Sequence, residues 1–246
     1  MKQVNLKIKE NKLIAKNTYR LILTGDLSNK YPYRPGSFIN LRIPSFYLRR
    51  PISICDISSK EVTLIYKVVG EGTLKLSKMK KGEIDALVDM GNGYNMNPVK
   101  SIALLVGGGA GIPPMYYLSK ELLKRNKKVI VVLGFNSKEE IFYANEFKKL
   151  GIQVVIATLD GSVGVKGLVT DAMKGLKYDY VYACGPIPML KAIYKDAKAP
   201  GQYSLEERMG CGFGACMGCT CKTLYGHKRI CKDGPVLTKE EIVWEK

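Results

Sequence analysis

Residues 101–114 read SIALLVGGGAGIPP, an apolar run followed by a glycine-rich turn and a pair of prolines. A short, unbroken apolar run is typical of a strand buried on both faces of a parallel sheet. Proline suits the first turn of a helix, where its missing N–H costs little. The stretch therefore predicts a buried strand, a tight turn and a helix, which is the opening unit of an α/β domain.

The same alternation continues toward the C-terminus. Helices are predicted over residues 115–125 and 187–197, and further strands over residues 128–133, 153–157 and 178–183. Strands that alternate with helices in this way indicate a parallel sheet covered by helices.

The glycine-rich turn can bind a diphosphate. Glycines at 107–109 allow tight backbone angles and a close approach to the amides at the helix start. Taken alone, the turn could also be a plain tight turn. Two later strand ends, LDGS at 159–162 and ACGPIPM at 183–189, place small residues at the sheet edge where such folds bind ligands. The nucleotide site is predicted at Gly107, Gly108, Gly109, Gly111, Pro113, Asp160, Cys184, Gly185 and Pro186.

Residues 1–97 have a different texture, with short alternating runs separated by proline and glycine. Strands are predicted over residues 6–9, 19–23, 38–43, 52–57 and 62–68, and a short helix over residues 74–79. This spacing is typical of an antiparallel barrel or sandwich. Its possible phosphate-binding elements are RRPIS at 49–53, IYK at 65–67 and GEGT at 70–73, although a basic strand edge and a capped helix would look the same.

Five of the seven cysteines lie in residues 209–237. Cys211, Cys216 and Cys219 have the C-x4-C-x2-C spacing of a plant-type two-iron, two-sulfur cluster, and Cys231 supplies a fourth thiolate. The alternative is a structural zinc site, but zinc ligands usually come as two closely spaced pairs. Cys221 is interpreted as a non-ligand on a strand over residues 220–224, and Cys55 as a core thiol.

Composition excludes several classes of function. The net charge of +17 suggests nucleic-acid binding, but the lysines are dispersed and no recognition module accompanies them, so we expect none. No apolar run reaches the roughly 20 residues of a membrane span, and no export signal is recognised, so we expect a cytoplasmic protein with reduced thiols. The only histidine, His227, falls in a turn, which argues against histidine-based acid–base chemistry.

The motifs follow one another in an order that resembles the ferredoxin reductase superfamily: RPIS, GT, GGGAGIPP, DGS and CGP over residues 50–186. The resemblance implies a multidomain α+β protein. It would have an antiparallel β-barrel FAD domain at 1–97, a Rossmann-like α/β NAD domain at 98–199 and a small C-terminal iron–sulfur domain at 200–246. It also implies that FAD is bound by Arg50, Pro51, Ile52, Ser53, Ile65, Tyr66, Lys67, Gly72 and Thr73.

The tail narrows the resemblance further. SLEERMGCGFGACMGC at 204–219, closed by ICKDGPV at 230–236, is similar to the electron transfer subunits of class 1B dihydroorotate dehydrogenases. That family implies FAD, NAD, a [2Fe-2S] cluster on Cys211, Cys216, Cys219 and Cys231, and no catalytic residues of its own for dihydroorotate. It also implies an FMN-containing catalytic partner subunit, in a heterotetramer of two plus two chains, that oxidises dihydroorotate to orotate in pyrimidine biosynthesis.

The resulting hypothesis is an electron relay from the partner's FMN through the cluster and FAD to NAD. NAD is favoured over NADP mainly through the resemblance, since the segment at 134–138 has no arginine to bind a ribose phosphate. Two alternatives remain: a similar subunit of a ferredoxin-NADP reductase or sulfhydrogenase complex, and a flavin-free zinc-binding scaffold.

Overall fold

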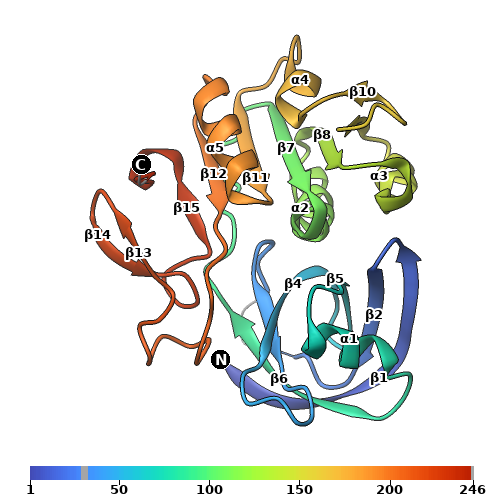
Figure 1. Ribbon diagram of the computed structural model, residues 1–246. Coiled ribbons are helices and arrows are strands. Elements are labelled where there is room, and N and C mark those ends of the chain that lie inside the picture. Colours follow the sequence, from blue (N-terminus) through green and yellow to red (C-terminus); the bar gives the residue numbers. More distant parts are fainter. Residues whose placement is uncertain (29–32, 245–246) are drawn as a thin grey trace.

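The computed structural model describes residues 1–28 and 33–244. Within these ranges the chain forms a β-barrel, a seven-stranded sheet with helices on both faces, and a small lobe that lies beside them (Figure 1). No helix in the described ranges is long and apolar enough to cross a bilayer.

The barrel closes in the order β1-β2-β5-β4-β3-β6, with every neighbouring pair antiparallel. Its strands are β1 (Lys2–Ala15), β2 (Thr18–Thr24), β3 (Phe38–Leu41), β4 (Arg50–Ile57), β5 (Glu61–Lys67) and β6 (Glu83–Met90). Apolar side chains that alternate along these strands fill the interior. The predicted barrel is confirmed, and β6, which no predicted strand covered, closes it by pairing with both β1 and β3.

The sheet has the order β10-β9-β8-β7-β11-β12-β15, in which only β15 runs antiparallel. Its strands are β7 (Ile102–Gly108), β8 (Lys128–Phe135), β9 (Gln153–Thr158), β10 (Val165–Lys166), β11 (Tyr180–Cys184), β12 (Gly201–Ser204) and β15 (Val236–Thr238). The predicted parallel sheet is confirmed.

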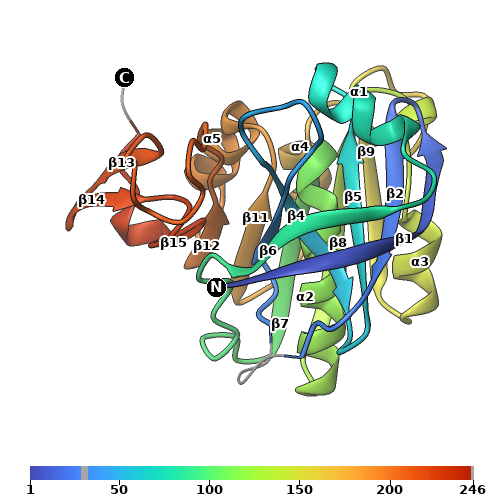
Figure 2. The ribbon, with the colours of Figure 1, turned by 90° about the horizontal axis from the view of Figure 1, so that it is seen from below.

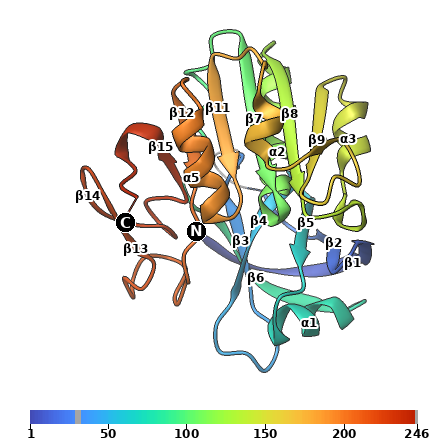
Figure 3. The same ribbon diagram turned by 45° about the horizontal axis from the view of Figure 1, so that its top comes forward.

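Helices cover the two faces of the sheet in pairs, and Figure 3 shows the sheet with the top of the molecule tilted forward. One apolar core lies under α2 (Ile112–Lys124) and α3 (Ala144–Lys149). The other lies under α4 (Val169–Met173) and α5 (Ile187–Asp196). Helix α2 begins three residues earlier than predicted because the proline pair lies inside its first turn.

The chain beyond residue 200 both extends the sheet and forms the lobe. Strands β12 and β15 pair at the sheet edge, with Tyr203 opposite Leu237. Between them lie the cysteine loop and a hairpin of β13 (Thr220–Thr223) and β14 (Gly226–Arg229), seen at the side of the molecule in Figure 2. This arrangement ties the lobe to the sheet at both of its ends.

Polar contacts hold the barrel against the sheet. The Tyr94 hydroxyl, fully buried, donates to the carbonyl of Ala183 at 3.0 Å. The Tyr117 hydroxyl of α2 donates to the carbonyl of Tyr33 at 2.8 Å, and Lys120 of α2 pairs with Asp56 of β4 at 2.6 Å. These contacts fix the crevice between the two bodies, where the candidate sites lie.

Candidate cofactor and cluster sites

A cavity of about 360 Å³ lies between the barrel, the sheet edge and the start of the lobe. It is lined by eight of the nine residues predicted for the flavin and by one predicted for the nucleotide, namely Arg50, Pro51, Ile52, Ser53, Ile65, Tyr66, Lys67, Thr73 and Cys184. Most of these residues lie together because β4 and β5 are neighbouring strands of the barrel, and both strands line this cavity.

The two adjacent arginines have different environments. Arg49 is committed to the fold, since its guanidinium pairs with both carboxylate oxygens of Asp85, at 3.0 and 2.8 Å. Arg50 lines the cavity, lies over the Phe46 ring at 5.0 Å and has no carboxylate partner among the described residues. A Cβ on Gly72 would lie 2.5 Å from the Arg50 guanidinium, so glycine keeps its space open. Arg50 is thus the arginine available for a phosphate.

The start of α1 (Glu71–Lys78) also faces this cavity. The Thr73 hydroxyl accepts from the backbone N–H groups of Val69 and Gly70 at 3.0 and 3.2 Å, which fixes the turn before the helix. The positive end of a helix favours a bound anion. The Ser53 hydroxyl has no hydrogen-bond partner among the residues described by the structure, and so it can bind a polar ring atom.

A second cavity, of about 450 Å³, lies over the carboxyl ends of the parallel strands. Its walls include Gly108 at the end of β7 and Gly109 just after it, residues 134–136 at the end of β8, and Pro186 before α5. Gly111 does not line it but is required by packing, because a Cβ there would lie 2.1 Å from the carbonyl oxygen of Cys184. This is the edge where open α/β sheets bind ligands.

The remaining predicted nucleotide residues lie around this cavity instead of on its wall. Gly107 is in strand β7 and Pro113 is buried in α2. Gly185 approaches the backbone of Gly108, with its would-be Cβ 3.2 Å from that nitrogen. Asp160 is exposed and accepts from the Ser162 backbone and hydroxyl at 2.9 and 2.7 Å, which orders the turn after β9.

Lys67 connects the two cavities, since it lines both. Its ammonium group lies 3.2 Å from the Glu140 carboxylate, which also receives a hydrogen bond from Asn136 at 3.0 Å. Burial acts to raise the pKa of Glu140, but the hydrogen bonds from Asn136 and Lys67 outweigh it and hold that pKa below its ordinary value. Glu140 and Asn136 were not predicted; the only sequence signal for them was their place just after a parallel strand.

The flavin-side cavity also reaches the start of the lobe, where sequence reasoning missed Glu206, Glu207 and Met209. Cys184 lines the flavin-side cavity and is absent from the wall of the second one. Burial raises the pKa of its thiol to about 12, so Cys184 stays neutral at physiological pH.

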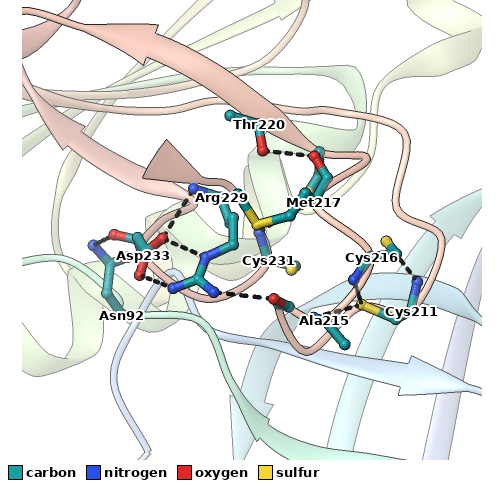
Figure 4. Close-up of polar contacts among 11 residues, drawn as sticks. Asn92, Cys211, Ala215, Cys216, Met217, Thr220, Arg229, Cys231 and Asp233 are labelled. Atoms are coloured by element: carbon teal, nitrogen blue, oxygen red, sulfur yellow. Dashed lines mark hydrogen bonds and ion pairs between the residues drawn. The ribbon is translucent and has the colours of Figure 1, made fainter. Parts of the chain in front are cut away.

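The cysteine loop is organised around sulfur atoms, as Figure 4 shows. The Cys211 sulfur accepts from the N–H groups of Ala215 and Cys216 at 3.2 and 3.4 Å, and the Cys219 sulfur accepts from the N–H of Cys231 at 3.4 Å. Burial opposes ionisation, but backbone N–H groups lower the pKa of Cys211 to about 6. This favours the thiolate, which is the form that binds iron.

The four cysteines lie as two linked pairs, and in residues 1–28 and 33–244 no three Cys, His, Asp or Glu side chains form a closed metal-binding group. The loop still fits a cluster by its donor set and its glycines. A Cβ on Gly210 would lie 3.1 Å from the Cys216 sulfur, so a side chain there would crowd the ligand. All four thiols are free of disulfides.

The other singled-out residues lie apart from the candidate sites. Cys221 is half-buried on β13, whose predicted strand is confirmed, and packs against the core. Cys55 is fully buried in the crevice core. His227 is exposed on β14, opposite Lys222, and not in the turn where it was predicted.

Known proteins with similar sequences point to the same family as these sites. The chain is 46% identical, over 98% of its length and 99% of the relative, to the "Dihydroorotate dehydrogenase B (NAD(+)), electron transfer subunit" of Fusobacterium nucleatum subsp. nucleatum. It is 45% identical to the subunit of the same name from Geobacillus sp. (strain WCH70), over 99% of each chain. The chain belongs to this family. Its residues 206–243 match the iron-sulfur cluster binding domain of dihydroorotate dehydrogenase B, and residues 105–195 match the oxidoreductase NAD-binding domain.

Two solved structures resemble the fold of this chain. A structure titled for flavin-based electron bifurcation by the NADH-dependent reduced ferredoxin-NADP oxidoreductase superposes with a TM-score of 0.88 at 30% identity, covering 97% of this chain and 90% of that one. Phthalate dioxygenase reductase superposes with a TM-score of 0.69 at 16% identity, covering 90% and 87%. The chain is thus an oxidoreductase subunit for electron transfer, with FAD, a [2Fe-2S] cluster and NAD as its cofactors.

Proposed function

We propose that this subunit carries electrons from the FMN of a dihydroorotate dehydrogenase catalytic subunit, through its [2Fe-2S] cluster and FAD, to NAD. The observation that supports this most directly is the continuity of the three sites. Lys67 and Ala110 line both cavities. Met209 lines the flavin-side cavity and lies two residues before Cys211, which is at most about 7 Å of chain.

The residues of the chain supply binding and orientation, and the cofactors supply the chemistry. FAD can exchange a hydride with a nicotinamide and single electrons with a cluster, which makes it the converter between the two carriers. Arg50 and the start of α1 would hold its phosphates, and Ser53 would hydrogen-bond its ring system. The turn at Gly107–Gly109 and the wall at Pro186 would hold the nicotinamide nucleotide in the second cavity.

Cys211, Cys216, Cys219 and Cys231 are the proposed cluster ligands, and Cys221 is proposed not to bind iron. A pair of substitutions tests both statements. Cys216→Ser should abolish dihydroorotate-dependent NAD reduction by the assembled complex and remove iron from the subunit. Cys221→Ser, on β13 and two residues beyond Cys219, should retain iron and turnover. NAD reduction that survives Cys216→Ser would refute the route, and loss of iron in Cys221→Ser would refute the ligand assignment.

NAD is the proposed nucleotide. The one cation on the described wall of the nucleotide cavity, Lys67, is paired with the Glu140 carboxylate at 3.2 Å, and the exposed Lys138 does not line that wall, so a ribose phosphate would meet no unpaired cation there. The proposed division of labour is a flavin domain at 1–97, a nucleotide domain at 98–199 and a cluster domain at 200–246. The matched domains at 105–195 and 206–243 fit it, although β12 and β15 belong to the central sheet.

The proposed assembly is a heterotetramer of two such chains and two FMN-containing catalytic chains in the cytoplasm, working in pyrimidine biosynthesis. The free thiols of all seven cysteines suit a reducing compartment. Native mass spectrometry of the complex purified by a tag on this chain identifies the partner and the stoichiometry. A ferredoxin-NADP oxidoreductase partner in place of the dihydroorotate-oxidising chain would refute the proposal.

A further inference from the structure

The guanidinium of Arg229 links the two segments that carry the cluster cysteines. Its Nη1 donates to the carbonyl of Gly214 at 3.0 Å, in the loop between Cys211 and Cys216. Its Nε and Nη2 donate to the two carboxylate oxygens of Asp233 at 2.9 and 3.2 Å. Figure 4 shows the Arg229 side chain between Asp233 and the cysteine loop. A single cation therefore joins the loop to the segment just beyond Cys231.

Neutral hydrogen bonds hold this ion pair in place from the other side. The backbone N–H of Asn92, in the hinge between the barrel and the sheet, donates to the carbonyl of Gly234 at 2.7 Å. The Asn92 side chain donates to the carbonyl of Asp233 at 3.2 Å and accepts from the N–H of Val236 at 3.1 Å. The backbone around Asp233 is thus anchored without any further charge.

Both charged groups lie where water screens them only in part. The exposed fractions of the Arg229 and Asp233 side chains are 27% and 32%. The hydrogen bonds that Arg229 donates to Asp233 raise the pKa of Arg229 most strongly, and negative charge on Cys231 and Cys219 acts in the same direction. The guanidinium is therefore within electrostatic range of two of the proposed ligands as well as of its carboxylate partner.

Fixed charges beside an iron–sulfur cluster change its reduction potential. Reduction adds one electron, so the reduced cluster is one unit more negative than the oxidised one. A neighbouring cation stabilises the reduced form, and a neighbouring anion destabilises it. Arg229 lies between the loop and Asp233, so its effect on the cluster should exceed that of the carboxylate behind it.

Building on the proposed function, we propose that the Arg229–Asp233 pair sets the reduction potential of the [2Fe-2S] cluster, with the guanidinium raising the potential and the carboxylate lowering it. Arg229 and Asp233 are positioning and tuning residues in this proposal and not ligands. The pair would keep the cluster poised between its electron donor and acceptor, while Asn92 keeps the pair in register.

The test is an EPR-monitored redox titration of the purified holo-subunit, with one electron supplied to each cluster by dithionite through mediator dyes of known potential. Arg229→Gln should lower the reduction potential of the cluster, and Asp233→Asn should raise it. At a fixed solution potential, each substitution should change the ratio of reduced to oxidised cluster by about three- to tenfold. Arg229→Lys, which keeps the charge, should shift the reduction potential less than Arg229→Gln. Asn92→Ala, which loosens the segment without changing charge, is the matched control and should leave the potential near the wild-type value.

Shifts of opposite sign support tuning, because a purely mechanical clamp gives no reason for opposite signs. Shifts of the same sign, or no shift, would overturn the proposal. If Arg229→Gln cannot retain iron, Asp233→Asn decides alone: a higher reduction potential supports the proposal, and a lower or unchanged one overturns it. Loss of the cluster in Asp233→Asn as well would show that the pair only holds the loop closed. A wild-type subunit without a cluster would instead refute the proposed function.

Discussion

Exchanging Arg50 for glutamine should separate flavin binding from folding. Arg50 faces the cavity without a carboxylate partner among the described residues, whereas Arg49 beside it pairs with Asp85. We expect Arg50→Gln to weaken FAD binding and to leave the stability of the chain unchanged. Arg49→Gln is the matched control. It should lower the stability of the chain and leave FAD binding unchanged.

The magnitudes follow from the contacts. A hydrogen bond to a charged group contributes about 1.5 to 3 kcal/mol, so the loss of an Arg50–phosphate contact should weaken FAD binding about ten- to hundredfold. Arg49 and Asp85 are only 17% and 20% exposed, and Arg49 is the first cause that lowers the pKa of Asp85. Removing Arg49 leaves that carboxylate with Gln3 at 3.1 Å and Arg42 at 3.8 Å. The free energy of unfolding should fall by about 1 to 3 kcal/mol.

The assay pairs a fluorescence titration of deflavinated protein with FAD and urea unfolding of the same deflavinated protein. Arg50→Lys should restore part of the affinity, since it returns the charge without the planar fork. Equal FAD affinity in Arg50→Gln and the wild type would refute the assignment of Arg50. Weaker FAD binding in Arg49→Gln, with stability unchanged, would show that Arg49, and not Arg50, binds the phosphate.

Two further predictions concern the nucleotide domain. The wild-type chain should favour NADH over NADPH in kcat/KM for flavin reduction, and Glu140→Gln should reduce that preference several-fold; equal use of the two nucleotides by the wild type would contradict the NAD assignment. Burial acts to raise the pKa of Asp179, but backbone N–H groups at the start of β7 outweigh it and hold that pKa below its ordinary value. A folded-state pKa below the unfolded one gives stability that is present above the unfolded value, about 4, and is lost as pH falls through the folded one. Asp179→Asn should therefore flatten the acid side of the stability curve below about pH 4 in urea unfolding, and an unchanged acid side would contradict this.

The sequence predicts most of what is local in this fold. The glycine turn after β7, the alternation of the barrel strands and the proline-led start of α2 follow from backbone preferences and periodicity. The candidate flavin residues come from two neighbouring strands and a turn, and each was visible as a short motif. They converge because β4 pairs with β5, as expected for consecutive antiparallel strands.

Long-range pairing is what the sequence could not provide. β15 pairs with β12 in the central sheet, although the whole cysteine loop separates the two strands along the chain. In the sequence, both strands therefore look like parts of the cysteine-rich tail. Asn92 and Asp233 meet across 141 positions, and Lys67 reaches Glu140 from a different body of the fold. A polar residue in a hinge or just after a strand gives little local signal of such contacts.

The central claim is most directly tested by an anaerobic NADH titration of the purified subunit, followed by visible absorption and EPR, with flavin and metals assayed on the same sample. We predict about one flavin and about two irons per chain, bleaching of the flavin bands by NADH, and the EPR signal of a reduced [2Fe-2S] cluster. Zinc without flavin, or a cluster that stays oxidised after NADH has reduced the flavin, would contradict a continuous path from the nucleotide cavity to the cysteine loop.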